Sequence, residues 1–174
     1  GLNEEDIDYT MSNYEIAVAG PPETIERYNE IVLDYLEIQS ISKENSEFTY
    51  DIELPEGFSN LENLNSVTVS FDASNWTEKV FTIPAESIRF VNASNRHKVS
   101  LVSDALYNVT FFGEAEAIEA LEPEDIVAEV DLSEKELILG QYQHPVRISA
   151  PNKGLLWATG DYSVVIQVNE VKEE

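Results

Sequence analysis

The chain contains no cysteine. Disulfide bridges, thiolate metal ligands, cysteine nucleophiles and thiol redox chemistry are therefore excluded. The absence does not fix the compartment, because an exported domain with a sufficient hydrophobic core needs no disulfide. A cysteine-free chain is compatible with either side of a membrane.

Basic residues are scarce, since 10 Lys and Arg stand against 34 Asp and Glu, and the 174 residues carry a formal charge of -24. Phosphate backbones and anionic lipids bind clustered cations, so we predict no nucleic-acid partner and no binding to acidic membrane surfaces. The chain is nevertheless 43% hydrophobic and only 25% charged. That composition is too apolar for an acidic disordered segment, and we expect the chain to fold.

Long hydrophobic runs and glycine-rich motifs are also missing. No apolar run approaches 18 residues, and the acidic start at residues 1–6 has no basic or hydrophobic leader region. We expect a piece of a longer protein that meets the membrane only through a transmembrane segment outside this sequence, with Gly1 left by tag cleavage. Only 7 glycines occur, without GxGxxG or GxxxxGK(S/T), so dinucleotide and P-loop sites are excluded.

An internal repeat organises what is present. Residues 14–20 (YEIAVAG) match residues 107–113 (YNVTFFG) at an offset of 93. The alternation predicts strands with Tyr14, Ile16 and Val18 on one face of the first copy and Tyr107, Val109 and Phe111 on one face of the second. Short helices are expected over 22–28 and 114–122, the second stopped by Pro123.

The match continues downstream with a drifting offset, as insertions in loops would produce. Residues 36–38 match 128–130, residues 52–54 match 146–148, and residues 67–71 match 164–168, at offsets of 92, 94 and 97. Each copy then reads as strand, short helix and three strands. We predict a mainly β fold of two tandem small β-domains, each with one short helix.

The second copy has further predicted strands at 79–84, 87–91 and 99–102. The first copy has only residues 1–13 in that position, so its opening strand either lies outside this sequence or is supplied elsewhere, and an uncovered sheet edge is implied. Residues 72–78 read as a linker, with Trp76 a candidate for covering the junction. The predicted domains are 1–75, with a net charge of -15, and 76–174, with a net charge of -9.

Catalytic side chains are few. His144 enters a predicted strand and has no evident partner in the sequence, so we interpret it as structural. His97 lies with Arg96 and Lys98 in the one locally basic stretch, which is either a small contact site for an anion or a protein, or a solvated loop. We predict no catalytic, cofactor-binding or metal-binding residues and no cofactor.

Acidic clusters and Trp157 have alternative interpretations. Residues 122–125 and 3–6 could hold calcium, but they lack the spacing and turn glycine of a calcium loop, and solvated loops are favoured. Trp157 is either a sugar-stacking platform or, given Leu155, Leu156 and Ala158 beside it, part of a core. Glycosylation sequons begin at Asn75, Asn92 and Asn108, and we interpret them as coincidental because Asn108 lies in a predicted strand.

Residues 79–168 resemble the YbbR-like domain family. The resemblance rests on an opening strand (KVFTIPA), the strand that ends in Gly113, residues 121–133 (LEPEDIVAEVDLS) with a "di-a-vDls" pattern, Gly140 before PVRI, and the closing YSVVI. The first copy keeps Gly20 but has residues 38–40 (IQS) where vDls would be, so it resembles a divergent or N-terminally truncated copy. The family implies tandem domains outside the bacterial membrane behind one N-terminal transmembrane helix, and some members regulate a membrane diadenylate cyclase.

The sequence is compatible with three functions. The first is a non-enzymatic extracytoplasmic module of a membrane-anchored regulator, with a membrane-protein partner, a diadenylate cyclase being the one implied by the resemblance. The second is a cell-surface adhesin or carbohydrate-binding β-module, which exposed coplanar aromatic side chains would support and a buried Trp157 would not. The third is an enzyme with a carboxylate pair between the domains, which needs convergent acids in a deep pocket.

Overall fold

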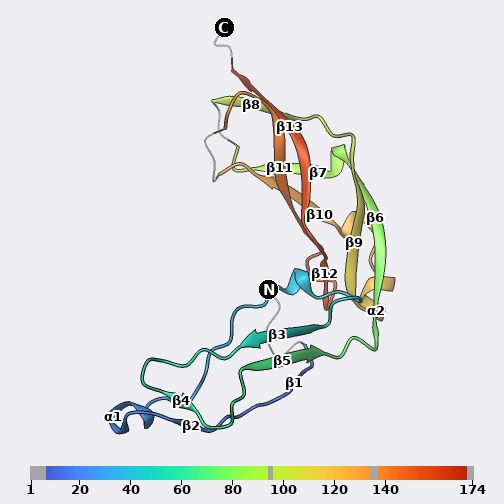
Figure 1. Cartoon of the computed structure of the whole chain (residues 1–174). Coiled ribbons are helices and arrows are strands. Elements are labelled where there is room, and N and C mark those ends of the chain that lie inside the picture. Colours follow the sequence, from blue (N-terminus) through green and yellow to red (C-terminus); the bar gives the residue numbers. More distant parts are fainter. Residues whose placement is uncertain (1–6, 94–95, 134–136, 172–174) are drawn as a thin grey trace. The chain divides into compact units, whose positions relative to one another are not determined.

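The computed structural model describes residues 7–93, 96–133 and 137–171. The chain folds into two compact units, Gly1–Ser74 (unit 1) and Asn75–Glu174 (unit 2), and the expected mainly β fold with one short α-helix in each unit is confirmed (Figure 1). None of the helices in the described ranges has the length and apolar character needed to cross a membrane.

Unit 2 contains two sheets. The larger has the strand order β7-β10-β11-β13-β8, in which β7 and β10 are parallel and the other neighbours antiparallel, and the smaller has the order β12-β9-β6. The strands are β6 (Trp76–Pro84), β7 (Ile88–Val91), β8 (His97–Leu101), β9 (Ala105–Glu114), β10 (Val127–Asp131), β11 (Gly140–Ser149), β12 (Leu156–Ala158) and β13 (Tyr162–Glu170). The helical segments are α2 (Ala115–Glu119) and the 3-10 turns η3 (Ala85–Ser87) and η4 (Pro123–Asp125). Every strand predicted for the second copy is present.

The core of unit 2 lies between the two sheets. Inward side chains of β6 and β7 pack against those of β9, β10, β11 and β13 in one hydrophobic cluster, in which the rings of Phe81 and Phe111 meet edge to face at 5.8 Å. The end of strand β9 is buried on both faces, because Phe111 lies in this core while its next residue, Phe112, joins a second cluster with Trp76 and Trp157. Trp76 is therefore a strand residue of unit 2, and the predicted linker over 72–78 is wrong beyond Asn75.

One predicted face in unit 2 is also wrong. Tyr107 was expected to lie with Val109 and Phe111, but Val109 and Phe111 are buried whereas Tyr107 is exposed. The pairing of β6 with β9 shifts register between Phe81 and Ile83, and Asn108 has a positive φ of 56°. This β-bulge inserts a residue, so Leu106 instead of Tyr107 faces inward, and Asn tolerates the left-handed conformation that a bulge requires.

Unit 1 is much less regular. Its strands are β1 (Tyr9–Met11), β2 (Val18–Ala19), β3 (Glu47–Asp51), β4 (Ser59–Asn60) and β5 (Ser66–Phe71), and its helical segments are α1 (Pro22–Ile25) and the 3-10 turn η2 (Ile38–Ser40). Three predicted strand segments are wrong, because residues 14–17, 36–37 and 52–54 form no strand and Ile38 begins a 3-10 turn. Of the described residues of unit 1, only Ile41 and Val67 are buried hydrophobic side chains.

The strands that unit 1 does form repeat those of unit 2. Its larger sheet has the order β1-β5-β3, and β5 and β3 match β13 and β11 in the sequence repeat. Phe71 pairs with Tyr9 as Val168 pairs with Val99, so β1 corresponds to β8. Val18 pairs with Asn60 as Phe111 pairs with Ala158, so β2-β4 corresponds to β9-β12.

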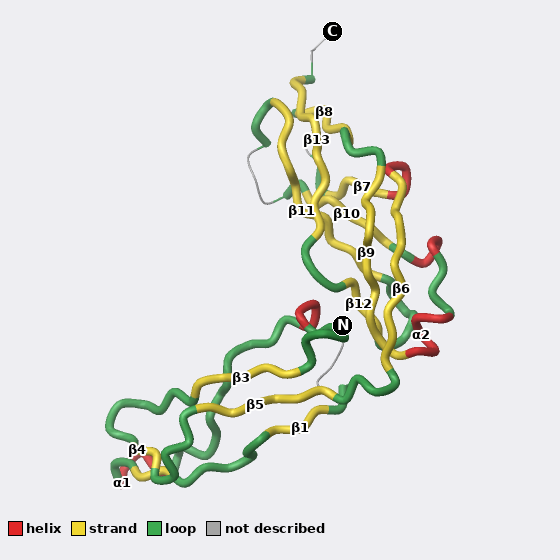
Figure 2. The backbone as a smooth tube through the Cα atoms, turned by 45° about the vertical axis from the view of Figure 1, so that its right-hand side comes forward, coloured by secondary structure: helices red, strands yellow, loops and turns green. Residues whose placement is uncertain are grey.

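The described part of unit 1 therefore has the unit 2 fold without three of its strands. No strand among the described residues of unit 1 corresponds to β6, β7 or β10, and Figure 2 shows how much of residues 7–74 is loop. The sequence that matches β10 is present at residues 36–38 but forms no ladder. Because β10 lies between β7 and β11 in unit 2, its counterpart has no parallel partner in unit 1.

The two repeat glycines serve the same close approach in both units. A Cβ on Gly113 would lie 2.3 Å from the Leu155 carbonyl oxygen and 2.6 Å from the Leu156 Cα atom, on the neighbouring strand β12 and the residue before it. A Cβ on Gly20 would lie 2.7 Å from the ring of Phe58, which directly precedes β4, the unit 1 counterpart of β12. A side chain at Gly113 would separate the paired strands, because the close atoms are backbone, whereas a Cβ at Gly20 would meet only the side chain of Phe58.

We therefore expect Gly113→Ala to destabilise unit 2 by about 1–3 kcal/mol, because the obstructing atoms are backbone and a well-packed core tolerates added volume poorly. Chemical denaturation followed by tryptophan fluorescence would measure it, since both tryptophans lie in unit 2. Gly20→Ala is the matched control, because it lies in unit 1 and should leave this unit 2 transition unchanged. An unchanged unfolding midpoint for Gly113→Ala would contradict the packing described here.

Candidate functional site

Two adjoining grooves lie on unit 1, besides a smaller concavity of about 320 Å³ beside Pro21 and Phe58. The first, which we call the Tyr14 groove, has a volume of about 380 Å³ and follows the segment that matches β9. The second, the Tyr35 groove, has a volume of about 430 Å³ and follows the segment that matches β10. Met11 and Leu33 line both, so the grooves adjoin.

The Tyr35 groove is the more apolar of the two. Its lining includes the inward side chains of β1 and β5 and the segment before η2, namely Tyr9, Met11, Leu33, Leu36, Ile38, Val69 and Phe71. Tyr35 lies on its rim and is 92% exposed, and Val32, earlier in the same segment, is 79% exposed. Large apolar side chains left open in this way are typical of contact surfaces.

The charge around these grooves is strongly negative. The sequence of unit 1 carries 17 acidic and 2 basic residues. Asp34 lines the Tyr35 groove beside Tyr50, and burial together with the charge of Asp34 raises the pKa of the Tyr50 hydroxyl. An apolar groove in acidic surroundings suits an apolar ligand that carries positive charge.

The structure gives His144 a structural place. It is 5% exposed in β11, its ring lies 6.5 Å from that of Tyr142, and its Nδ1 is 3.2 Å from the Pro145 carbonyl oxygen. His97 begins β8, an edge strand of the larger sheet, where it pairs with Glu170. Arg96 and Lys98 are exposed next to it, and charges of this kind protect an open sheet edge from unwanted pairing.

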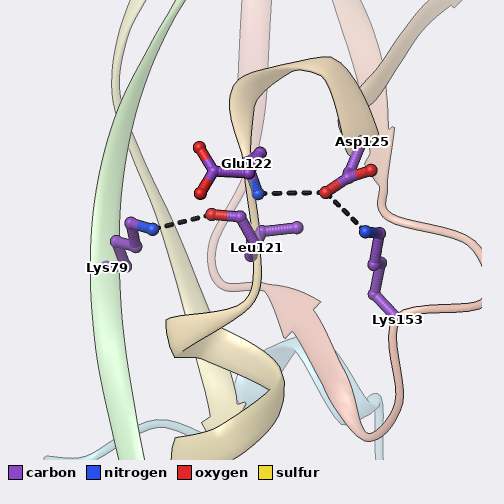
Figure 3. Close-up of polar contacts among 5 residues, drawn as sticks. All are labelled: Lys79, Leu121, Glu122, Asp125 and Lys153. Atoms are coloured by element: carbon purple, nitrogen blue, oxygen red, sulfur yellow. Dashed lines mark hydrogen bonds and ion pairs between the residues drawn. The ribbon is translucent and has the colours of Figure 1, made fainter.

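The acidic cluster at residues 122–125 belongs to a structural polar network (Figure 3). Asp125 Oδ2 accepts a hydrogen bond from the Glu122 backbone N–H at 3.0 Å and lies 2.7 Å from Lys153 Nζ. The Lys153 hydrogen bond, and then that of the Glu122 backbone, lower the pKa of Asp125. On the facing strand, Lys79 Nζ donates to the Leu121 carbonyl at 2.7 Å.

Metal ligation finds no support in these contacts. Within residues 7–93, 96–133 and 137–171, no group of three or more His, Cys, Asp or Glu side chains is placed to hold an ion. The other acidic cluster considered, at residues 3–6, lies outside the described residues. Asp125 ties the segment after α2 to the loop before β12, and the Lys79–Leu121 hydrogen bond joins that segment to β6.

The aspartate of the vDls pattern closes strand β10. Asp131 Oδ1 accepts hydrogen bonds of 2.9 Å from Asn92 Nδ2 and from the Ser133 backbone N–H, while the Leu132 N–H donates to the Val91 carbonyl. The bond from Asn92, then those from Ser133, lower the pKa of Asp131 to about 2. Asn92 has a positive φ of 56°, so this carboxylate fixes the turn after β7. Unit 1 has η2 in place of the pattern.

Trp157 is 6% exposed and packs edge to face on Trp76 at 5.3 Å, so it fills a core as the sequence favoured. The position considered for sugar stacking is therefore closed. Of the three sequon asparagines, Asn92 uses its amide on Asp131 and Asn108 forms the bulge of β9. These roles give both residues a structural reason to be asparagine.

Sequence analysis missed the grooves themselves. It predicted residues 14–18 and 36–38 as strands, which hid the fact that their side chains line open concavities. The signal was nevertheless present, because within the sequence as given only residues 1–13 stand where the second copy has the segments of β6 and β7. A strand whose neighbours are missing leaves its inward face uncovered.

Comparisons with known proteins concern the fold. No protein-family model and no curated protein matches the chain. A solved YbbR-like domain from Listeria monocytogenes is similar to 56% of this chain and 99% of its own, with 15% identity and a TM-score of 0.42. A solved YbbR-like protein from Streptococcus pneumoniae is similar to 98% of this chain and 90% of its own, with 14% identity and a TM-score of 0.37. YbbR-like is also the family that residues 79–168 resemble.

The hydrogen bond from Asn92 predicts a shifted titration. Because the pKa of Asp131 in the folded state lies below its ordinary value of 3.8, the ionised carboxylate stabilises unit 2 above about pH 3.8, and this contribution is lost as the pH falls through about 2. We expect Asn92→Ala to raise the pKa toward 3.8, as an NMR titration of the carboxyl carbon would measure. Asn169→Ala on β13 is the matched control. If Asp131 titrates with the same midpoint in the unsubstituted chain, in Asn92→Ala and in Asn169→Ala, the Asn92 contact is contradicted.

The Lys79 contact predicts a loss of stability. In Lys79→Met the aliphatic stem remains but the Leu121 carbonyl loses its charged donor, and hydrogen bonds to charged groups contribute about 1.5–3 kcal/mol. We expect unit 2 to be destabilised by an amount in that range, measured by urea denaturation. Lys98→Met, at an exposed position of the edge strand, should change the free energy of unfolding far less. Equal effects of the two substitutions would show that the Lys79 bond contributes nothing.

Proposed function

We propose that this chain is a non-enzymatic protein-interaction module of a membrane-anchored bacterial YbbR-like protein, that it works outside the cytoplasm, and that it modulates a membrane diadenylate cyclase. The observation that carries the interaction role is the Tyr35 groove, an open apolar concavity in the more acidic unit. The family resemblance of residues 79–168 supports the anchoring, the compartment and the cyclase.

The chemistry of the groove suits a protein partner. Tyrosine is enriched where interface side chains contribute most to binding, and Tyr35 stands at the rim of the Tyr35 groove with almost its whole side chain in solvent. The apolar floor offers area to bury, while the surrounding carboxylates favour a partner with a basic rim. Association should therefore weaken as salt is raised, since exposed charges more than a Debye length apart are screened.

The test is capture from membranes. The tagged protein, anchored in bacterial membranes, would be solubilised in mild detergent, and co-purifying proteins would be identified and quantified by mass spectrometry. We expect a diadenylate cyclase in stoichiometric amount, with a change in its cyclic dinucleotide synthesis when the module is removed. Recovery of no membrane protein, with retention on cell-wall glycans instead, would refute the proposal in favour of the carbohydrate-binding function.

Two substitutions locate the contact. Tyr35→Ser should reduce the recovered cyclase at least about tenfold, because truncation of a central aromatic contact typically costs 2 kcal/mol or more. Leu61→Ser is the matched control. Leu61 is likewise a large, exposed apolar side chain of unit 1, at 61%, but it lines neither groove. Equal recovery with both variants would place the contact elsewhere.

A further inference from the structure

We propose that the free edge of strand β6 receives an extended segment of a partner protein, which adds a fourth strand to the smaller sheet of unit 2 and carries lysine or arginine opposite Glu78. The inference goes beyond the proposed function, because it assigns a second contact surface in the other unit and does not depend on the Tyr35 groove. The backbone of β6, the exposure of its side chains and the charge beside it carry the inference.

Strand β6 is the longest edge strand in the described part of the chain. It has nine residues and ends the strand order β12-β9-β6, so one of its sides is paired with β9 and the other has no strand among the described residues (Figure 2). The other edge strands of unit 2 are shorter, with five residues in β8, four in β7 and three in β12. An edge strand presents unpaired backbone donors and acceptors, which proteins ordinarily guard by short length, lysine or proline.

The pairing with β9 fixes which backbone groups of β6 point to the free edge. The Ala115 N–H donates to the Asn75 carbonyl at 3.0 Å, and the Ala85 N–H donates to the Asp104 carbonyl at 3.0 Å, so the odd-numbered residues face β9 at both ends of the strand. An antiparallel ladder uses alternate residues for these bonds. The residues that direct their N–H and C=O groups to the free edge are therefore the even-numbered ones, Glu78, Val80 and Thr82.

The side chains at the free edge are also open to solvent. Glu78, Val80 and Thr82 are exposed, and Val80 has 57% of its side chain in solvent. An added strand would place a side chain directly opposite Val80 and bury apolar area that is now in water. Lys79, the one lysine of β6, does not guard the edge, because its Nζ donates to the Leu121 carbonyl and lies over a core ring.

Acidic residues beside β6 select a basic segment. Helix α2 packs against β6, and residues 114–125, which include α2 and η4, contain six acidic residues and no basic one. Glu78 lies on the edge itself, where a residue of an added strand would stand directly opposite it. Opposite charges in such cross-strand pairs are favourable and like charges are unfavourable. A segment with lysine or arginine opposite Glu78 therefore fits this edge.

A partner protein fits the edge better than a second copy of this chain. Every copy carries a net charge of -24, so close contact between copies is opposed by repulsion. A short basic segment meets only attraction from Glu78 and from residues 114–125. Addition of a strand to an open sheet edge is a known mode of peptide recognition, in which backbone hydrogen bonds give affinity and alternate side chains give specificity.

The probe is a capped seven-residue peptide with valine at its centre, a lysine two positions to either side and threonine elsewhere. This spacing places the valine opposite Val80 and one lysine opposite Glu78, and threonine favours the extended conformation. In NMR titrations of the 174-residue chain we expect saturable binding, with slower amide exchange at Glu78, Val80 and Thr82 and no change in β8. The odd-numbered amides of β6 should change little, because they already bond to β9.

Two altered peptides separate strand addition from general charge attraction. N-methylation of the valine and of both lysines keeps the charge but removes the amide donors that would reach β6, and it should abolish detectable binding. Replacement of both lysines by glutamate keeps the donors and should also abolish binding. Equal binding of the N-methylated peptide would overturn strand addition, and equal binding of the glutamate peptide would overturn the basic partner.

A charge reversal in the chain locates the contact. Glu78→Lys should weaken binding of the lysine peptide about tenfold, because an attractive cross-strand pair becomes a repulsive one, and it should restore binding of the glutamate peptide. Glu170→Lys, at an exposed position of β13, changes the total charge equally and should leave both affinities unchanged. Equal effects of the two substitutions would overturn a contact at β6.

Other occupants and the Tyr35 groove give separate results. If the chain alone dimerises in sedimentation experiments and gains protected amides at residues 78–82, a second copy occupies the edge and the proposal is wrong. Tyr35→Ser should leave the affinity for the peptide unchanged. If the peptide fails while Tyr35→Ser still reduces recovery of the cyclase, strand addition at β6 is wrong and the proposed function stands. If the peptide binds β6 while no cyclase is recovered, strand addition stands and the proposed function falls.

Discussion

The pairing of β6 with β9 is the interaction on which unit 2 depends. It places Phe81 on Phe111 in the main core and brings Trp76 onto Phe112 on the other side of β9. The end of strand β9 is then buried on both faces, and the larger sheet has a wall to pack against. Unit 1 shows what the same sequence pattern does without this pairing, because only Val18 and Ala19 of the matching segment are in a strand.

The difference in side-chain burial between the two units follows from the presence or absence of the β6 pairing. The buried hydrophobic side chains described in the chain lie almost entirely in unit 2, although both units carry the same alternating apolar residues. A side chain at an open edge has neighbours on one side only and loses the contacts that a covering strand would supply. Segments with few buried contacts open at low free-energy cost, so unit 1 should open more readily than unit 2.

Sequence alone predicted much of unit 2 and little of unit 1, and the reason is physical. Alternation of apolar residues reports which face of a segment can be buried, and in unit 2 each such segment has a partner, so β6 to β11 and β13 were found. The short strand β12 was not predicted. The same alternation at residues 14–17 and 36–38 has no neighbouring strand, and a strand needs one for its backbone hydrogen bonds. The face of Tyr107 was wrong for another reason, since alternation cannot register the extra residue of a bulge at Asn108. The repeat glycines, in contrast, were found in both units, because a neighbouring segment lies close to each of them.

The acidic charge of the chain gives the open face of unit 1 its selectivity. An uncovered apolar edge is ordinarily an aggregation hazard, and proteins protect such edges with charge. In unit 2 the edge strand β8 has Lys98 near its start and Arg96 directly before it. Unit 1 instead has carboxylates around an apolar floor, which repel identical molecules and attract a basic segment. The charges that oppose self-association are thus the same ones on which the proposed basic partner rests.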